Sequence, residues 1–187
     1  MSIYKHNNTE RGIVLIICLV LLICVSVLGI YGMRNVMLGE RVAGNTLEKQ
    51  RSTQAAESAL RYGEWWLSRN NLGEQNACTD TVTNGNQLGL MRVCTKRLVN
   101  PGTIPWTGRT VYTPPNMHID KSGGLTEKDI NYYAAPDLYI SYLGEGLRGR
   151  GKFYELSASG YGGQKNTATV VQSTFTFSTN SINLGEL

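Results

Sequence analysis

Histidine and cysteine are scarce in this sequence, which has two histidines and four cysteines in 187 residues. His6 precedes a long apolar run, and His118 lies in a proline-rich stretch. A zinc site needs about four Cys or His ligands, and no such set can be assembled from these residues. His118 is the one candidate for a nucleophilic triad, but no serine or cysteine elbow accompanies it. We therefore expect no metal, no cofactor, no small-molecule substrate and no catalysis.

Positive charge is not concentrated in any segment. Residues 1–12, 34–73 and 74–187 carry net charges of +1, +2 and +1, which add up to the total of +4. Dedicated nucleic-acid binding needs a basic patch, so the charge pattern does not predict it. Proline is also sparse, with 5 residues against 21 glycines, which excludes collagen and a disordered tract. The length suits one domain, or one domain plus an extension.

No charged residue occurs between Ile13 and Met33, a run of 21 residues of which fourteen are Leu, Ile or Val. As a helix this run would be about 31 Å long, which matches the hydrocarbon core of a bilayer. Its insertion is favourable by roughly 4–8 kcal/mol on a translocon scale. The sequence therefore predicts a transmembrane helix over residues 13–33, in which Cys18 and Cys24 are small apolar fillers.

A cleaved secretory signal is the alternative interpretation of this run. Such signals have an apolar region of about 7–15 residues and a small-x-small cleavage site. The run is longer than that, and its only weak match to a cleavage site is Val27-Leu28-Gly29. A retained anchor fits better. Its orientation stays open, because basic residues lie on both sides of the run.

Residues 34–72 contain no proline and continue the helical pattern. A stripe at spacings of three, four and seven should face a partner surface. Its members are Leu38, Val42, Thr46, Thr53, Ala56, Leu60, Gly63 and Leu67. We expect residues 52–69 to pack firmly and 39–46 to be less protected, because Gly39 and Gly44 weaken the helix. Tyr62, Trp65 and Trp66 should belong to the core, and Glu57 and Arg61 should pair at i,i+4.

The periodicity changes from 3.6 to 2 beyond Gly73, so residues 73–187 should form a β-rich head. Strands are predicted over residues 137–143, 152–159 and 167–178. The last two should form an antiparallel hairpin across a glycine-rich loop. Residues 100–136 hold all five prolines and read as irregular loop. The predicted fold class is α+β, with one long N-terminal helix whose distal half packs on a small antiparallel sheet.

Cys78 and Cys94 lie 16 positions apart in the polar head. Their spacing is not that of a CxxC redox motif. A disulfide is the natural interpretation if the head is extracytoplasmic, and it would contribute about 3 kcal/mol. Two reduced, buried thiols remain the alternative.

Two motifs in the segment 144–152 resemble nucleotide-binding loops. Residues 144–149 match G-x-G-x-x-G, and 146–152 resemble a P-loop. Both motifs need a helix directly after them. A strand is predicted there instead, so we interpret the segment as a turn. Arg148, Arg150 and Lys152 on this turn could contact DNA phosphates or anionic sugars, but three charges on a loop are more often a solvated tip.

Two stretches resemble a known family. The leader ending Glu10-Arg11-Gly12 before the apolar helix looks like a class III prepilin leader. The stretches 38–45 (LGERVAGN) and 54–61 (QAAESALR) are similar to PilX-type minor pilins of type IV pili. Residues 154–163 and 170–174 are similar to the closing hairpin of that group. The resemblance covers about 80 residues, over 11–67 and 153–177, and assigns nothing to 95–136.

The resemblance implies a leader over residues 1–12, cut after Gly12 by prepilin peptidase to leave Ile13 as the N-terminus. It further implies an inner-membrane anchor, a periplasmic helix over 34–72 and a head that later reaches the pilus and the cell surface. Other minor pilins, the major pilin and a tip adhesin are the implied partners. Gly29 and Gly32 would let neighbouring helices approach closely.

One residue departs from the pilin pattern. Most pilins carry Glu at the fifth mature position, and here that position is Ile17. A subunit without this carboxylate is expected at or near the filament tip, where it helps to prime assembly. Two other hypotheses stay open: a pseudopilin of type II secretion, and a tip module that binds DNA or glycans through the cations of the 144–152 turn.

Overall fold

The structure is a computed structural model that describes residues 11–69, 75–79, 82–121, 131–146 and 151–178. The chain divides into two compact units, Met1–Asn45 and Thr46–Leu187. One long N-terminal helix and a mixed β-sheet make up the fold, which is the α+β, pilin-like arrangement predicted from the sequence.

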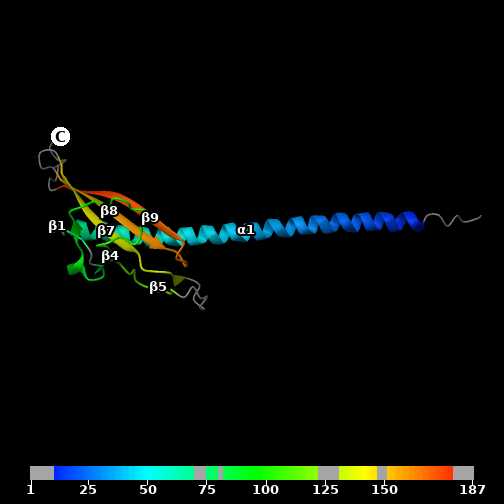
Figure 1. The fold of residues 1–187 in the computed structure, drawn as a ribbon, viewed down its shortest axis with the longest axis horizontal. Coiled ribbons are helices and arrows are strands. Elements are labelled where there is room, and N and C mark those ends of the chain that lie inside the picture. The colour runs from blue at the N-terminus through cyan, green and yellow to red at the C-terminus, as the bar shows by residue number, and fades with distance from the viewer. Residues whose placement is uncertain (1–10, 70–74, 80–81, 122–130, 147–150, 179–187) are drawn as a thin grey trace, which may run out of the picture. The chain divides into compact units, whose positions relative to one another are not determined.

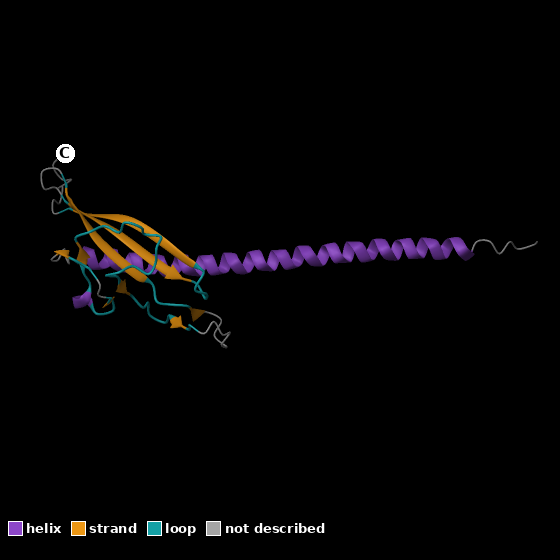
Figure 2. Cartoon of the chain, in the orientation of Figure 1, coloured by secondary structure: helices purple, strands orange, loops and turns teal. Residues whose placement is uncertain are grey.

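Helix α1 runs without interruption from Arg11 to Ser68 (Figure 2). Proline is absent from this stretch, so no backbone N–H is lost from the helical ladder. The predicted transmembrane and continuation segments therefore form one element. Helical character was predicted up to residue 72, whereas α1 ends at Ser68; residues 70–72 lie outside the described part of the chain.

The first unit consists, in its described part, of the N-terminal portion of α1. From Gly12 to Asn45 every side chain that is described there is exposed. This portion belongs to the one helix, among the described residues, that is long and apolar enough to cross a membrane. Its apolar surface has no partner within the unit.

Three long strands form the centre of the second unit: β7 (Asp137–Glu145), β8 (Lys152–Tyr161) and β9 (Ala168–Phe177). They lie side by side and antiparallel in Figure 1, with Tyr139 opposite Ser157 and Ser157 opposite Gln172. The three predicted strands and the β8–β9 hairpin are thereby confirmed. Each strand extends to within two residues of its predicted bounds.

Short strands make the sheet mixed and not purely antiparallel as predicted. They are β1 (Gln75–Asn76), β2 (Thr83–Asn84), β3 (Val93–Cys94) and β4 (Thr110–Val111). β3 joins the edge of β7 in parallel and β4 joins it in antiparallel, while β1 and β2 pair in parallel with β3 and β4. Two-residue strands have no periodicity to read, so the sequence could not reveal them.

The stretch 100–136 is also more ordered than the predicted irregular loop. It contains β4 and a separate parallel pair, β5 (His118–Ile119) with β6 (Asn131–Tyr132). A 3₁₀ turn, η2 (Leu88–Leu90), precedes β3. These elements place the middle of the chain along β7, where the candidate site described below is formed.

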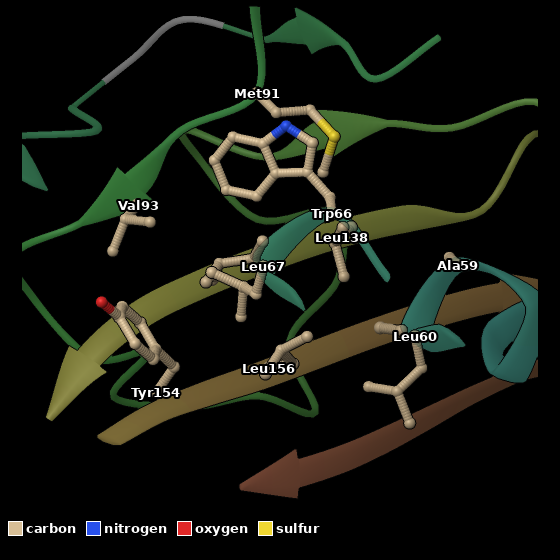
Figure 3. Close-up of a cluster of buried hydrophobic side chains, with 11 residues drawn as sticks. Ala59, Leu60, Trp66, Leu67, Met91, Val93, Leu138, Tyr154 and Leu156 are labelled. Carbon is tan, nitrogen blue, oxygen red and sulfur yellow. The ribbon is translucent and has the colours of Figure 1, made fainter. Parts of the chain in front are cut away.

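The main core lies between the C-terminal part of α1 and one face of the sheet (Figure 3). Leu67, Leu138 and Leu156 have no exposed surface, and Tyr154 is 1% exposed. Of the predicted stripe, Ala56, Leu60, Gly63 and Leu67 are buried. Their burial confirms that residues 52–69 pack firmly. Leu38 and Val42, which belong to the first unit, are exposed.

The predicted aromatic cluster is only partly in the core. Trp66 is buried and Tyr62 is half-buried, but Trp65 is 42% exposed. Trp65 lies two positions, or about half a helical turn, from both Gly63 and Leu67 of the buried stripe, and it therefore points off the helix face that meets the sheet. Its ring stacks on Tyr62 at 5.6 Å between centroids, and the Arg69 guanidinium lies 5.4 Å from its centroid. The assignment of Trp65 to the core was wrong.

Candidate functional surfaces

The predicted processing residues all lie in the first turns of α1. Ile13 and Ile17 are 64% and 54% exposed, and nothing lies within 4 Å of a Cβ placed on Gly12. Residues 1–10 of the predicted leader are outside the described part. Since α1 begins at Arg11, the predicted cleavage point follows the second residue of the helix.

Between Ile13 and Met33 the first unit offers an almost wholly apolar surface. A contiguous apolar surface of this length is unfavourable in water and marks contact with lipid or with another apolar helix. Cys18 and Cys24 are free and exposed on it. A Cβ on Gly29 or Gly32 would meet nothing within 4 Å, so these glycines leave a flat area. A flat area is the kind of surface at which two membrane helices approach closely.

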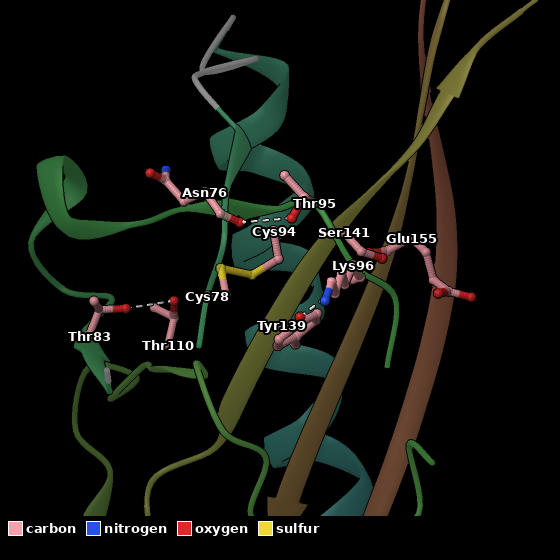
Figure 4. The surroundings of a disulfide bond; sticks show 10 residues. All are labelled: Asn76, Cys78, Thr83, Cys94, Thr95, Lys96, Thr110, Tyr139, Ser141 and Glu155. Carbon is pink, nitrogen blue, oxygen red and sulfur yellow. Dashed lines mark hydrogen bonds between the residues drawn. A yellow bond between two sulfur atoms is a disulfide. The ribbon is translucent and has the colours of Figure 1, made fainter. Parts of the chain in front are cut away.

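The disulfide between Cys78 and Cys94 is present, as predicted, with its Cα atoms 5.4 Å apart (Figure 4). A second apolar cluster surrounds it, formed by Cys94, Trp106 and Tyr139. Because Leu138 and Ile140 face the main core and side chains alternate along a strand, Tyr139 faces the opposite side of β7. The disulfide therefore holds the segment around it against the outer face of the sheet.

Polar contacts fasten the same segment to the sheet. Arg97 donates two hydrogen bonds to the Glu155 carboxylate, from Nε at 2.9 Å and from Nη2 at 2.5 Å. The Tyr139 hydroxyl donates to the Lys96 carbonyl at 2.9 Å. The hydrogen bond from Arg97 lowers the pKa of Glu155, because it stabilises the ionised carboxylate.

Arg109 and Asp137 form a second, more deeply buried ion pair. Arg109 Nε donates to Asp137 Oδ1 at 3.1 Å, and Arg109 Nη1 donates to the Trp106 carbonyl at 3.1 Å. The Asp137 side chain is only 7% exposed. Burial raises the pKa of Asp137 from 3.8 to about 6, and the attraction of Arg109 offsets this effect only in part.

This shift predicts how stability changes with pH. Below pH 6 the folded state binds the Asp137 proton more tightly than the unfolded chain does, so the free energy of unfolding should fall as pH rises from about 4 to about 6. Glu155 acts in the opposite sense, because its lowered pKa adds stability that is lost in acid.

The variants Asp137→Asn and Glu155→Gln separate these two effects. The measurement is urea unfolding of the full chain in detergent, followed by tryptophan fluorescence at several pH values. It gives the change of the unfolding free energy with pH for each variant. Asp137→Asn should remove the decline in the free energy of unfolding between pH 4 and 6, whereas Glu155→Gln should make this decline steeper. An unchanged pH profile in Asp137→Asn would contradict the assigned pKa.

The cation cluster predicted on the 144–152 turn is only partly described. Arg148 and Arg150 lie outside the described residues, and Lys152 is half-buried at the start of β8. Gly146 N donates to the Gly151 carbonyl at 2.8 Å across this turn. The element that follows is strand β8, as predicted, whereas a phosphate-binding loop requires a helix there.

His118 is exposed on β5, and no described Ser or Cys is seen to pair with it. Among the described residues, no group of three or more His, Cys, Asp or Glu side chains could hold a metal ion. The features that the described surface does offer are packing faces and ion pairs.

Sequence reasoning missed a set of contacts between α1 and the end of β8. The Gly163 N–H donates to Glu48 Oε2 at 2.6 Å, and Arg51 Nη1 donates to Glu48 Oε1 at 3.0 Å. Gly160 lies directly against the α1 backbone at Ser52 and Ala56. The glycine-rich stretch 160–163 was read only as a loop, although its glycines were a signal of close backbone approach.

A long apolar N-terminal helix with a mixed-sheet head defines the class of pilin-like α+β proteins. Residues 11–61 match the model of the PilX N-terminal family, which is consistent with a PilX-type minor pilin. The match covers the apolar segment and most of the remaining helix, and none of the sheet. The family is structural and points to pilus components as partners. No curated protein and no solved structure matches the chain.

Proposed function

We propose that this chain is a minor pilin that helps to assemble a type IV pilus and that it has a structural, non-catalytic role. The family match over residues 11–61 carries the proposal, because it spans both the apolar segment and the helix that packs on the sheet. Before assembly, the apolar segment is inserted in the inner membrane and the head lies in the periplasm. The subunit then enters the filament, which exposes the head at the cell surface.

Helix packing is the proposed mechanism of entry. An exposed apolar surface is stable in lipid and is equally stable when it is buried among other apolar helices. Transfer from the membrane to a filament core therefore costs little free energy. Gly29 and Gly32 provide the area for close approach. The proposed neighbours are the major pilin, other minor pilins and a tip adhesin.

Processing by prepilin peptidase is the first test. The mass and N-terminal residue of the protein extracted from membranes should show Ile13 as the first residue. Gly12→Val, which replaces the residue before the cut, should leave Met1 or the intact leader in place. A strain without the peptidase is the control. An intact leader in a strain with active peptidase would favour a plainly anchored protein.

Deletion of the gene separates the pilus from a secretion system. Surface pili counted by electron microscopy should become fewer, while secretion of exoproteins should be unchanged. The protein should also be present in sheared pili. Normal pilus number together with impaired secretion would assign the chain to a type II system.

Ile17 supports a position at or near the filament tip. A carboxylate without a cationic partner costs about 3 kcal/mol at the centre of a bilayer, and Ile17 lies inside the apolar run, as its fifth residue. We expect Ile17→Glu to lower pilus number, and Ile17→Gln, which has the same shape without the charge, to lower it less. Unchanged piliation in Ile17→Glu, with the protein spread evenly along fibres, would contradict the tip assignment.

A further inference from the structure

A cavity of about 660 Å³ lies in the second unit, between the β5–β6 pair and the ends of β7 and β8. We call it the basic pocket. Six of its lining residues carry the argument: Arg109, Lys121, Tyr133, Asp137, Tyr161 and Lys165. Neither the family match nor the proposed assembly role assigns a function to it. Its volume is within the range of sites for small organic ligands.

The rim of the basic pocket has an excess of positive charge. Arg109 is neutralised by its ion pair with Asp137. Lys121 and Lys165 are both exposed, and no ion pair within the described residues involves either of them. Two uncompensated ammonium groups at the mouth of a cavity attract an anion, and the apolar walls strengthen that attraction by excluding water.

The walls of the basic pocket are aromatic and aliphatic. Tyr133 and Tyr161 are half-buried, with ring centroids 5.6 Å apart and planes inclined by 57°. A tyrosine ring offers an apolar face with a polar hydroxyl at its edge. A sugar ring is complementary to such a wall, since it has an apolar face of C–H groups and hydroxyls around its rim.

The positive charge at the rim and the tyrosine rings in the walls together indicate which class of ligand fits the basic pocket. We propose that the basic pocket binds an acidic oligosaccharide, whose carboxylate lies between Lys121 and Lys165 and whose ring stacks on Tyr133 and Tyr161. An acidic peptide would satisfy the lysines but has no need of the paired tyrosine rings. The proposal is independent of the role in pilus assembly.

This pocket is not the cation cluster predicted on the 144–152 turn. Lys152 and Tyr161 stand at opposite ends of β8, a strand of ten residues. At about 3.3 Å per residue the two ends are roughly 30 Å apart. One small ligand therefore cannot contact both places, and variants can distinguish them.

Calorimetric titration of the full chain in detergent micelles tests the proposal. The ligands are trigalacturonate and 3′-sialyllactose, with lactose as the neutral comparison and tetra-aspartate as the acidic peptide. We expect at least one acidic sugar to bind, lactose to bind more weakly, and affinity to fall as salt is added. Lys121→Ala/Lys165→Ala should weaken binding by about tenfold or more.

Lys96→Ala/Lys152→Ala is the matched control, because it removes two charges from the head outside the pocket. It should leave binding unchanged. Tyr133→Ala should weaken the binding of lactose and acidic sugars alike, since it removes the stacking wall and no charge. The proposal is overturned if neither acidic sugar binds, if only tetra-aspartate binds, or if the control variant weakens binding as much as Lys121→Ala/Lys165→Ala.

Discussion

Gly160→Val should destabilise the head by about 3 kcal/mol or more. A Cβ at this position would collide with the backbone of α1 at Ser52 O and Ala56 N, and with the Ala55 side chain. Backbone atoms in the middle of a helix cannot move aside as a side chain can. Valine is a favourable residue in a strand, so strand propensity would not account for the loss. The clash can be relieved only by separating β8 from α1.

The measurement is urea unfolding of the full chain in detergent, with tryptophan fluorescence as the signal. Gly102→Val is the matched control, because a Cβ there would meet nothing within 4 Å. Gly63→Ala should have an intermediate effect, since its Cβ would press on the methyl groups of Leu138 and Leu156, which can shift. Equal stability of Gly160→Val and Gly102→Val would mean that β8 does not lie against the helix at this point.

Loss of the disulfide is expected to have the second large effect. Cys78→Ser/Cys94→Ser should lower the free energy of unfolding by about 3 kcal/mol, because the unfolded chain is then no longer closed into a loop of about 17 residues. The apolar cluster around Cys94, Trp106 and Tyr139 should loosen as well. The Trp106 indole donates to the Pro101 carbonyl at 2.9 Å, so its hydrogen exchange reports on this segment.

Cys18→Ser/Cys24→Ser provides the control for the disulfide variant. These cysteines are free and lie in the first unit, so the stability of the head should not change. Mild reduction of the unaltered protein should reproduce the effect of Cys78→Ser/Cys94→Ser. If reduction leaves stability and Trp106 exchange as they were, the other contacts of the segment, chiefly Arg97 with Glu155, hold it without the disulfide.

Local sequence patterns were sufficient to predict the long helix and the long strands, because each of these elements repeats one periodic pattern over many residues. The uncharged run from Ile13 to Met33 predicted an apolar helix, because charge and apolarity over 21 residues depend on nothing else in the chain. The alternation in β7 and β8 predicted long strands for the same reason. The spacing of Ala56, Leu60 and Leu67 identified the helix face that is buried in the core.

Other features depend on residues that are distant in the sequence, and no local pattern contains them. The parallel pairing of β1 with β3 and of β2 with β4 joins segments of two residues each. The Arg109–Asp137 pair spans 28 positions, and the contact of Glu48 with Gly163 spans 115. Each requires the chain to be folded before the partners meet.

The candidate site residues divide in the same way. Gly12, Ile13 and Ile17 were predicted from a family resemblance, which needs only the order of residues along the chain and no tertiary structure. The basic pocket was not, since Lys121, Tyr133 and Tyr161 come from three separate segments that only the packing of the β5–β6 pair beside β7 and β8 brings together. Amino-acid order thus specifies the helix and the long strands, where periodic burial is a local property. Tertiary packing alone decides which charges and rings share a cavity, because that depends on distances between segments.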